Sequence, residues 1–397
     1  MSHLLLVLPI QVHREGGRLF VESQAHNGLS LWLKHFDYVT LACIEVAHQD
    51  CATLPLDTIR GADRLNYVSL PEAWYPHQFL AKLPSIMRLL KREIKKADYL
   101  QFGIWGLWGD WASVAALIAH RLKRPFSVWT DRVESQVHAT SANFKSGLAK
   151  IYTLINAKLM QHYERALIKR ATLGLFHGAD CYRTYAPFCS NPQLVHNIHI
   201  GEIDHISEEQ LERRLNNRPS ELRVVYAGRA VEDKGVFDWI SAIAKATHNG
   251  ALIKATWLGD GKLLDAAKKH ADDLGVSIRF TGSLPHEDVL AELKKHDVFM
   301  FCHKTLESPR CLIEALICGL PIIGYRSDYP SDLISKNGGG ILTHRDDIVM
   351  LERIIVKLQK SDEIIADLSR KARLDGLPFT DEKVFEHRSF LIKCLAV

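Results

Sequence analysis

Short apolar runs rich in β-branched residues alternate along the chain with longer segments that repeat apolar positions at helical spacing. In the first half, the runs with the length of buried strands are Leu4–Leu8, Tyr38–Ile44, Leu65–Leu70, Tyr99–Phe102, Phe126–Thr130 and Leu173–His177. The segments with helical period are Leu19–Lys34, Gln78–Lys96, Asp110–Arg121 and Leu148–Arg170. This alternation predicts an α/β fold in which helices cover both faces of a parallel sheet.

The second half repeats the pattern more clearly. Its predicted strands are Leu222–Gly228, Lys254–Gly259, Ile278–Gly282, Val298–Cys302 and Pro321–Tyr325. Its predicted helices are Val236–Thr247, Lys262–Leu274, Glu287–Lys295 and Pro309–Cys318. Several of these strands run straight into glycine, and the carboxyl ends of strands are where open α/β sheets bind ligands.

The chain has 397 residues, which fits two domains of about 150–200 residues each better than a single core. We expect an N-terminal domain over residues 1–200, a second domain over 201–380 and a last helix over 381–397, which would fit on either domain. The polar stretch Ile206–Glu221 is the predicted linker.

The composition restricts the protein's class and surroundings. The net charge of +4 is slight for this length and does not by itself argue for nucleic acid as a partner. The eight cysteines form no C-x-x-C pair, which favours free thiols over disulfides or zinc. No apolar run reaches the length of about 18 residues that a membrane span requires, and the N-terminus resembles a core strand more than a signal peptide. We therefore expect a cytoplasmic protein.

Candidate chemistry gathers at the predicted strand ends of the second half. In YAGRAVEDKG, Arg229 follows the strand directly and Lys234 stands five residues further on. A guanidinium and an ammonium in one loop suit a diphosphate, although two solvated surface charges are an equal alternative.

Two further features lie at neighbouring strand ends. Gly259 belongs to a Gly-Asp-Gly turn that allows backbone to approach a nucleotide, although a plain tight turn has the same sequence. Glu314 lies among apolar neighbours on the helix after Pro309. A carboxylate there either binds a partner such as ribose hydroxyls or lies on the exposed polar face of the helix.

In this order and spacing, the features resemble the retaining glycosyltransferases of the GT-B fold in family 4, which includes sucrose synthases and bacterial mannosyltransferases. The resemblance covers Leu222–Thr343, and its most specific part is Glu314-Ala-Leu-Ile-Cys-Gly-Leu-Pro, similar to the family's Glu-Ala-x-x-x-Gly-x-Pro. It implies two Rossmann-like doubly wound domains that face each other across a cleft. The implied reaction moves a sugar, with retention, from a UDP- or GDP-linked donor to a saccharide or lipid-linked saccharide, as in surface polysaccharide biosynthesis.

The resemblance also implies roles for individual residues. Arg229 and Lys234 would hold the donor diphosphate and Glu314 the ribose, while the pair Gly16-Gly17 would match the N-terminal loop that approaches the diphosphate. As an alternative, Gly16-Gly17 is a flexible turn. No Asp-x-Asp occurs in the sequence, so we expect no metal and no other cofactor.

Two positions depart from the family's pattern. The family usually places a second Glu eight residues before the ribose Glu, where Leu306 stands here, and we expect Glu307 to take over its contact with the transferred sugar. The family's His after the strand FSVWT is replaced by Asp131, which would orient the acceptor or the donor sugar, or would cap a loop.

Other segments leave functional and structural interpretations open. The segments around Leu83–Lys96 and Lys145–Arg170 are basic and amphipathic. They fit peripheral contact with the inner face of an anionic membrane, or ordinary helices that pack an apolar side on a sheet and expose a basic side to solvent. Three tryptophans at spacings of three either stack on a sugar or pack in the core: Trp105, Trp108 and Trp111. The alternatives to a transferase are a nucleotide-sugar 2-epimerase of the same fold and a non-catalytic scaffold with a degenerate site.

Overall fold

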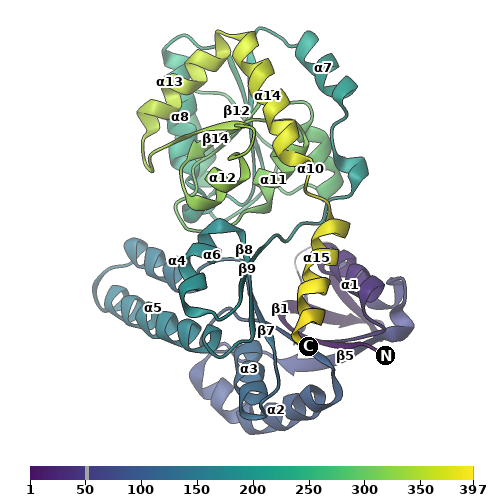
Figure 1. Ribbon diagram of the computed structural model, residues 1–397. Helices are drawn as coiled ribbons and strands as arrows, with labels where there is room; N and C mark the ends of the chain where they lie inside the picture. The colour runs from purple at the N-terminus through teal and green to yellow at the C-terminus, as the bar shows by residue number, and fades with distance from the viewer. Residues whose placement is uncertain (50–52, 397) are drawn as a thin grey trace. The chain divides into compact units, whose positions relative to one another are not determined.

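The computed structural model describes residues 1–49 and 53–396 of the chain. Its contacts divide the chain into two compact units (Figure 1). The first comprises Met1–His199 together with Asp381–Val397, and the second comprises Ile200–Thr380. Cys51, predicted as a free thiol, lies outside the described residues. Among the described residues, no helix is both long and apolar enough to cross a bilayer.

The N-terminal unit is built on one mostly parallel sheet. Its strands are β1 (His3–Glu15), β2 (Arg18–Glu22), β3 (Tyr38–Val46), β4 (Thr53–Pro55), β5 (Leu65–Pro71), β6 (Tyr99–Gly103), β7 (Ser127–Thr130), β8 (Leu173–His177) and β9 (Pro192–Val195). The parallel order is β5-β3-β1-β6-β7-β8-β9, while the last residues of β1 pair antiparallel with β2, which pairs with β4. The strands predicted for this half are confirmed, whereas β2, β4 and β9 were not predicted.

Helices cover both faces of this sheet and bury two separate apolar clusters. They are α1 (Ser23–His35), α2 (Pro76–Lys96), α3 (Trp111–Arg121), α4 (Glu134–Ser141), α5 (Gly147–Ile168), α6 (Gly178–Tyr185) and α15 (Asp381–Lys393). The predicted helix from Leu19 is partly wrong, because Leu19 and the residues up to Glu22 form β2. The last helix packs on α1 of this unit, where the ring centroids of Phe385 and Trp32 are 5.1 Å apart.

The C-terminal unit holds a second, wholly parallel sheet. Its strands are β10 (Leu222–Ala227), β11 (Ile253–Leu258), β12 (Ile278–Phe280), β13 (Val298–Phe301), β14 (Ile322–Tyr325) and β15 (Gly340–Thr343). Their order is β12-β11-β10-β13-β14-β15, the strand order of a Rossmann fold. The order reverses between β10 and β13, so ligands are expected beyond the carboxyl ends of these two strands.

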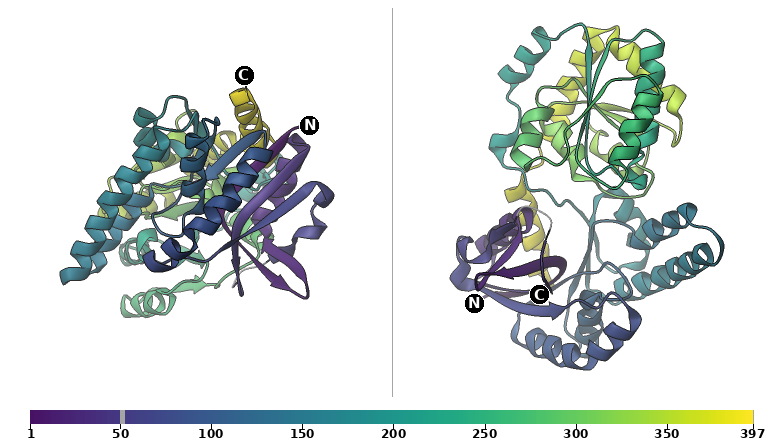
Figure 2. Two further views of the ribbon diagram at one scale, coloured as in Figure 1. Left: turned by 90° about the horizontal axis from the view of Figure 1, so that it is seen from below. Right: turned by 180° about the vertical axis from the view of Figure 1, so that it is seen from behind.

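Helices lie on both sides of the second sheet, as the view from behind shows (Figure 2). They are α7 (Glu208–Asn216), α8 (Val236–His248), α9 (Leu264–Asp273), α10 (His286–Leu293), α11 (Arg310–Ile317), α12 (Asp328–Leu333), α13 (Ile348–Gln359) and α14 (Asp362–Gly376). The prediction of two Rossmann-like α/β domains is therefore confirmed. The strand β15 and the helices α12 to α14 were not predicted.

The predicted linker Ile206–Glu221 is wrong, because this segment folds into the C-terminal unit. Ser207 and Gln210 form a capping box that starts α7, and Leu211 buries its side chain. The guanidinium of Arg214 donates hydrogen bonds to the carbonyl oxygens of Cys318 at 2.9 Å and of Gly319 at 2.6 Å. These bonds satisfy carbonyl groups left open at the end of α11, so the polar residues of the segment have a structural role.

Candidate functional site

Lys234 and Glu307 meet at the reversal point of the second sheet. Lys234 ends the turn after β10 and Glu307 lies in the loop after β13, before α11 begins at Arg310. The Lys234 ammonium forms an ion pair with a Glu307 carboxylate oxygen and lies 3.6 Å from an Asp233 carboxylate oxygen. Only about a tenth of either side chain of the pair is exposed. Because an ammonium carries three donors, the ion pair leaves others for a further acceptor such as a phosphate.

Glycine at position 235 allows this arrangement. Gly235 adopts φ +65°, and a Cβ there would lie 2.1 Å from the carbonyl oxygen of Cys302. The backbone N–H of Lys304 also donates to the carbonyl oxygen of Asp233 at 2.8 Å. The loops after β10 and β13 are therefore packed backbone to backbone, and this packing fixes the position of the Lys234 backbone.

Arg229 stands apart from these contacts. Its side chain is exposed, and no hydrogen bond or ion pair of its guanidinium occurs within the described part of the chain. Its backbone is nevertheless held, because Gly228 and Ala230 donate to the carbonyl oxygens of Leu258 and Asp260, each at 2.8 Å. Arg229 is thus an anchored residue whose donors remain available to an anionic ligand.

Gly259 is required by packing between loops. It adopts φ +134°, and a Cβ there would lie 2.3 Å from the carbonyl oxygen of Gly228. This close approach explains the glycine without a nucleotide. Its predicted contact with a nucleotide stays a prediction.

Glu314 lies on α11 with only 8% of the residue exposed. One of its carboxylate oxygens is 3.1 Å from Nε2 of His286, the first residue of α10. This hydrogen bond, more than any other effect, raises the pKa of His286. Glu314 therefore does not lie on an exposed polar face, and its paired carboxylate is suited to polar ligands.

Cys311 is the second residue of α11 and stands between Glu307 and Glu314 in the sequence. Desolvation of its thiol raises the pKa of Cys311, and the negative charge of Glu314 raises it further, whereas the positive charge of Lys234 lowers it. The thiol is therefore neutral and adds no charge to the site.

Two neutral, buried groups, one in β10 and one in the loop after β13, were not found from the sequence. The Tyr226 hydroxyl and Nε2 of His303 are 2.9 Å apart, and both side chains are buried. Burial lowers the pKa of His303, and the charge of Lys234 lowers it further. A neutral His303 adds no positive charge that would repel Lys234. Its position directly after a predicted strand was the one available signal.

Lys304, from the same loop, was also missed. Its ammonium forms ion pairs with Asp238 and Asp346, and the Tyr325 hydroxyl donates to Asp238 at 2.6 Å. These contacts tie the loop after β13 to α8 and to the segment after β15. Lys304 has its charge balanced by two carboxylates, so it is less available to a ligand than Arg229.

The remaining predicted residues belong to the N-terminal unit. Gly16 and Gly17 have φ values of +55° and +82° and join β1 to β2 as a hairpin turn of the kind that favours glycine. Asp131 is exposed and follows β7. The Arg132 side chain donates at 2.6 Å to Glu134, whose pKa is raised to about 7 by burial against the opposing effect of Arg132. The roles of Gly16, Gly17 and Asp131 in ligand binding stay predictions.

The tryptophans divide between the core and the surface. Trp111 is buried and stacks on Phe79 with ring centroids 4.7 Å apart, so its interpretation as a core residue is correct. Trp105 packs against Trp74 at 5.3 Å. Trp108 is 37% exposed and is the most exposed of the three.

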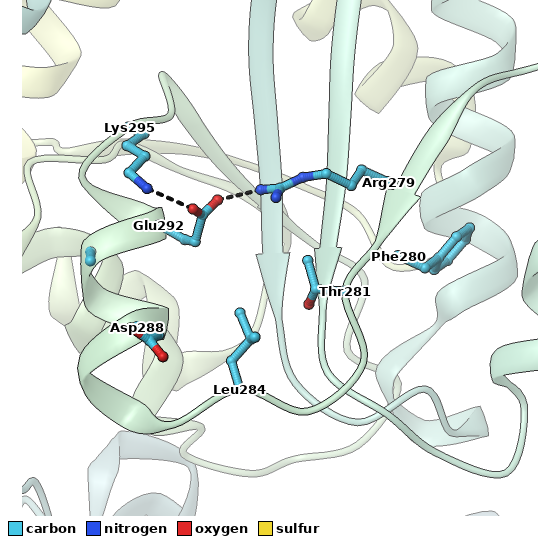
Figure 3. Close-up of a pocket in the computed structure, with 8 residues that line it drawn as sticks. Arg279, Phe280, Thr281, Leu284, Asp288, Glu292 and Lys295 are labelled. Carbon is cyan, nitrogen blue, oxygen red and sulfur yellow. Dashed lines mark hydrogen bonds and ion pairs between the residues drawn. The ribbon is translucent and has the colours of Figure 1, made fainter.

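The C-terminal unit also has a surface pocket of about 480 Å³ beside β12 (Figure 3). Arg279 and Lys295 line it, and both point toward Glu292, which pairs with both of them. None of the predicted site residues lines this pocket, which lies at the edge strand of the sheet. The ends of β10 and β13 are therefore the better candidate site.

Comparisons with known proteins agree with this fold. Residues 207–375 match the family "Glycosyl transferases group 1". The lipopolysaccharide core biosynthesis glycosyltransferase LpsE of Rhizobium meliloti is 30% identical over 238 residues, which cover 55% of this chain and 65% of LpsE. The amylovoran biosynthesis glycosyltransferase AmsK of Erwinia amylovora is 27% identical over 161 residues, which cover 38% of this chain and 39% of AmsK. The chain thus spans less than two thirds of the length of these relatives.

The fold is similar over the whole chain to that of Anabaena HepE, solved in complex with UDP. The TM-score is 0.69 at 15% identity, over 99% of this chain and all of HepE. The two Rossmann-like units and this likeness define the GT-B class of fold. The match to the family of glycosyl transferases group 1 lies within the C-terminal unit.

Proposed function

We propose that this protein is a glycosyltransferase that moves a sugar from a UDP- or GDP-linked donor to a saccharide or lipid-linked saccharide acceptor. The observation that carries the proposal is the meeting of Lys234 and Glu307 at the reversal point of a Rossmann sheet, with Glu314 on the helix that follows the Glu307 loop. The names of LpsE and AmsK favour an acceptor that belongs to a surface polysaccharide. The UDP in HepE makes UDP the first nucleotide to test.

The chemistry of the residues fits sugar transfer. A departing nucleoside diphosphate develops negative charge, which Arg229 and Lys234, both in the segment after β10, would stabilise. Glu314 would accept hydrogen bonds from ribose hydroxyls. Glu307, held by Lys234 beside the diphosphate, would contact the transferred sugar.

The direct test is release of nucleoside diphosphate from UDP- and GDP-sugars, measured with and without a saccharide acceptor. Acceptor-dependent release supports a transferase. Comparison of the anomeric configuration of the transferred sugar in the donor and in the product tests retention. Conversion of the donor sugar without any acceptor would instead identify an epimerase. Binding of nucleotide without turnover of any donor would identify a scaffold.

A further inference from the structure

Two helices of the N-terminal unit have a similar basic, amphipathic sequence but opposite environments. In α2, the large apolar side chains of Phe79, Ile86, Leu90 and Ile94 are buried in the core. Its exposed side carries Lys91 and other basic residues. The ordinary interpretation, a helix that packs its apolar side on a sheet, is therefore correct for α2.

In the first part of α5, the apolar side faces solvent. Six large apolar side chains are exposed, from 41% at Leu154 to 85% at Leu148: Leu148, Ile151, Tyr152, Leu154, Ile155 and Leu159. Five of them follow the spacing i, i+3, i+4, i+7 and i+11, so they form one stripe along the helix. The buried residues of this stretch are small ones, Thr153 and Ala157. This stripe of residues, the α5 stripe, is covered by no other described part of the unit.

The charges around the α5 stripe have one sign. Between Lys145 and Arg170 the sequence holds a single carboxylate, Glu164. Glu164 is buried, where it accepts hydrogen bonds from the backbone N–H of Ser135 at 3.0 Å and from its hydroxyl at 2.7 Å. The basic residues Lys150 and Lys158 are exposed on the same helix. The exposed surface of α5 is therefore apolar and basic, with no acidic side chain among its described residues.

We propose that α5 docks on the surface of an anionic lipid bilayer. A helix lies in a membrane interface when large apolar residues form one side of it and lysines flank that side, because the apolar side chains enter the acyl boundary and the ammonium groups meet anionic headgroups. The stripe runs from Leu148 to Leu159 on this 22-residue helix, and α4 packs beside α5 in the same unit (Figure 1). The charge complementarity favours anionic lipid over a neutral surface. This inference does not rest on the proposed sugar transfer.

The test uses the full-length protein and vesicles of phosphatidylcholine with or without phosphatidylglycerol. We expect cosedimentation with the anionic vesicles only, weakened by salt because the lysines act through screened charge. Lys158 lies beside the stripe, so the variant Lys158→Gln should partition about 5-fold more weakly, from about 1 kcal/mol for a basic residue at such a surface. Lys91→Gln on α2 removes the same charge and is the matched control, which should bind as the wild type does.

The stripe itself is tested by Ile151→Gln/Ile155→Gln/Leu159→Gln. These side chains are about half exposed, so the variant should fold, as circular dichroism would show, and lose binding by about tenfold or more. The single variant Ile155→Gln gives the same direction of change with less risk to folding.

Three results would overturn the proposal. The first is a wild type that does not bind anionic vesicles. The second is a loss of binding in the α2 control equal to that in the α5 lysine variant. The third is a lipid-free oligomer that the stripe variant converts to monomer, because the stripe would then bind a second copy of this chain.

Discussion

The ammonium of Lys234 and the carboxylate of Glu307 form an ion pair, and only about a tenth of either side chain is exposed to solvent. The two residues lie 73 positions apart in the sequence and come from loops after neighbouring strands of the second sheet. Burial of both charges ties the stability of this region to the same residues that we assign to the donor.

Removal of one partner should therefore destabilise the protein. Lys234→Met leaves Glu307 buried without its counter-charge, and the expected loss is about 3–5 kcal/mol in the free energy of unfolding of the C-terminal unit. The double variant Lys234→Met/Glu307→Leu should recover most of this loss but bind no nucleotide. Urea unfolding of the single and double variants gives the coupling energy. A double variant no more stable than Lys234→Met would contradict the ion pair.

The variant Arg229→Ala should impair sugar transfer without a large change in the stability of the protein. Because the Arg229 side chain is exposed and forms no hydrogen bond or ion pair within the described residues, we expect a change in the free energy of unfolding within about 0.5 kcal/mol. Loss of a donor at a developing charge should lower the transfer rate by about 100–1,000-fold. Lys254→Ala, at the amino end of β11, is the control and should leave the rate unchanged. A rate for Arg229→Ala equal to that of the control would remove Arg229 from the site.

The hydrogen bond between His286 and Glu314 should make stability depend on pH. The pKa of His286 is raised above its ordinary value of 6.5, so the folded protein holds the proton more tightly than the unfolded chain. The bond thus stabilises the protein fully below pH 6.5, and this contribution is lost as the pH rises through the raised pKa.

Titration of the histidine ring signals by NMR checks this directly, with His286→Gln to assign the signal. In Glu314→Gln the pKa of His286 should fall, because the charge that raises it is gone. An unchanged pKa would show that Glu314 does not act on His286.

Gly235→Ala should be far more harmful than a matched glycine substitution. Gly250→Ala has a similar positive φ, +86°, with no atom within 4 Å of the added Cβ, and should cost about 1–2 kcal/mol from backbone strain alone. At Gly235 the added Cβ would lie 2.1 Å from a carbonyl oxygen, which should cost about 1–3 kcal/mol more. Chemical denaturation of both variants makes the comparison, and equal losses would refute close packing of the two loops.

Strands and helices with strong periodicity could be predicted from the sequence, and short or polar elements could not. The strand β13 is a continuous apolar run, and β10 and β11 each contain only one charged residue, so all three are easily recognised. The helix α7 has only one buried residue, Leu211, so its polar sequence resembles a linker until Arg214 is seen to bond the end of α11. The strand β2 has only five residues and pairs with both β1 and β4, contacts that its own sequence does not reveal.

Those residues of the candidate site that belong to a motif within one segment could be predicted from the sequence. Arg229, Lys234 and Glu314 follow from local sequence, because each lies next to a strand end or on a helix with a recognisable pattern. The partners His286 and His303 come from segments 28 and 77 residues away from the groups they contact. Such pairs are fixed by tertiary packing, so one sequence does not show which groups these histidines contact.

The central claim is that a nucleoside diphosphate binds at the ends of β10 and β13. It is tested most directly by thermal unfolding with UDP, GDP and ADP, on the wild type, Arg229→Ala and Lys254→Ala. A nucleotide at 100 times its dissociation constant should add about 2.7 kcal/mol to the stability of the unit that binds it. We expect UDP or GDP to stabilise the wild type and Lys254→Ala and to stabilise Arg229→Ala much less. No stabilisation of the folded wild type by any of the three, or an undiminished effect in Arg229→Ala, would contradict the account.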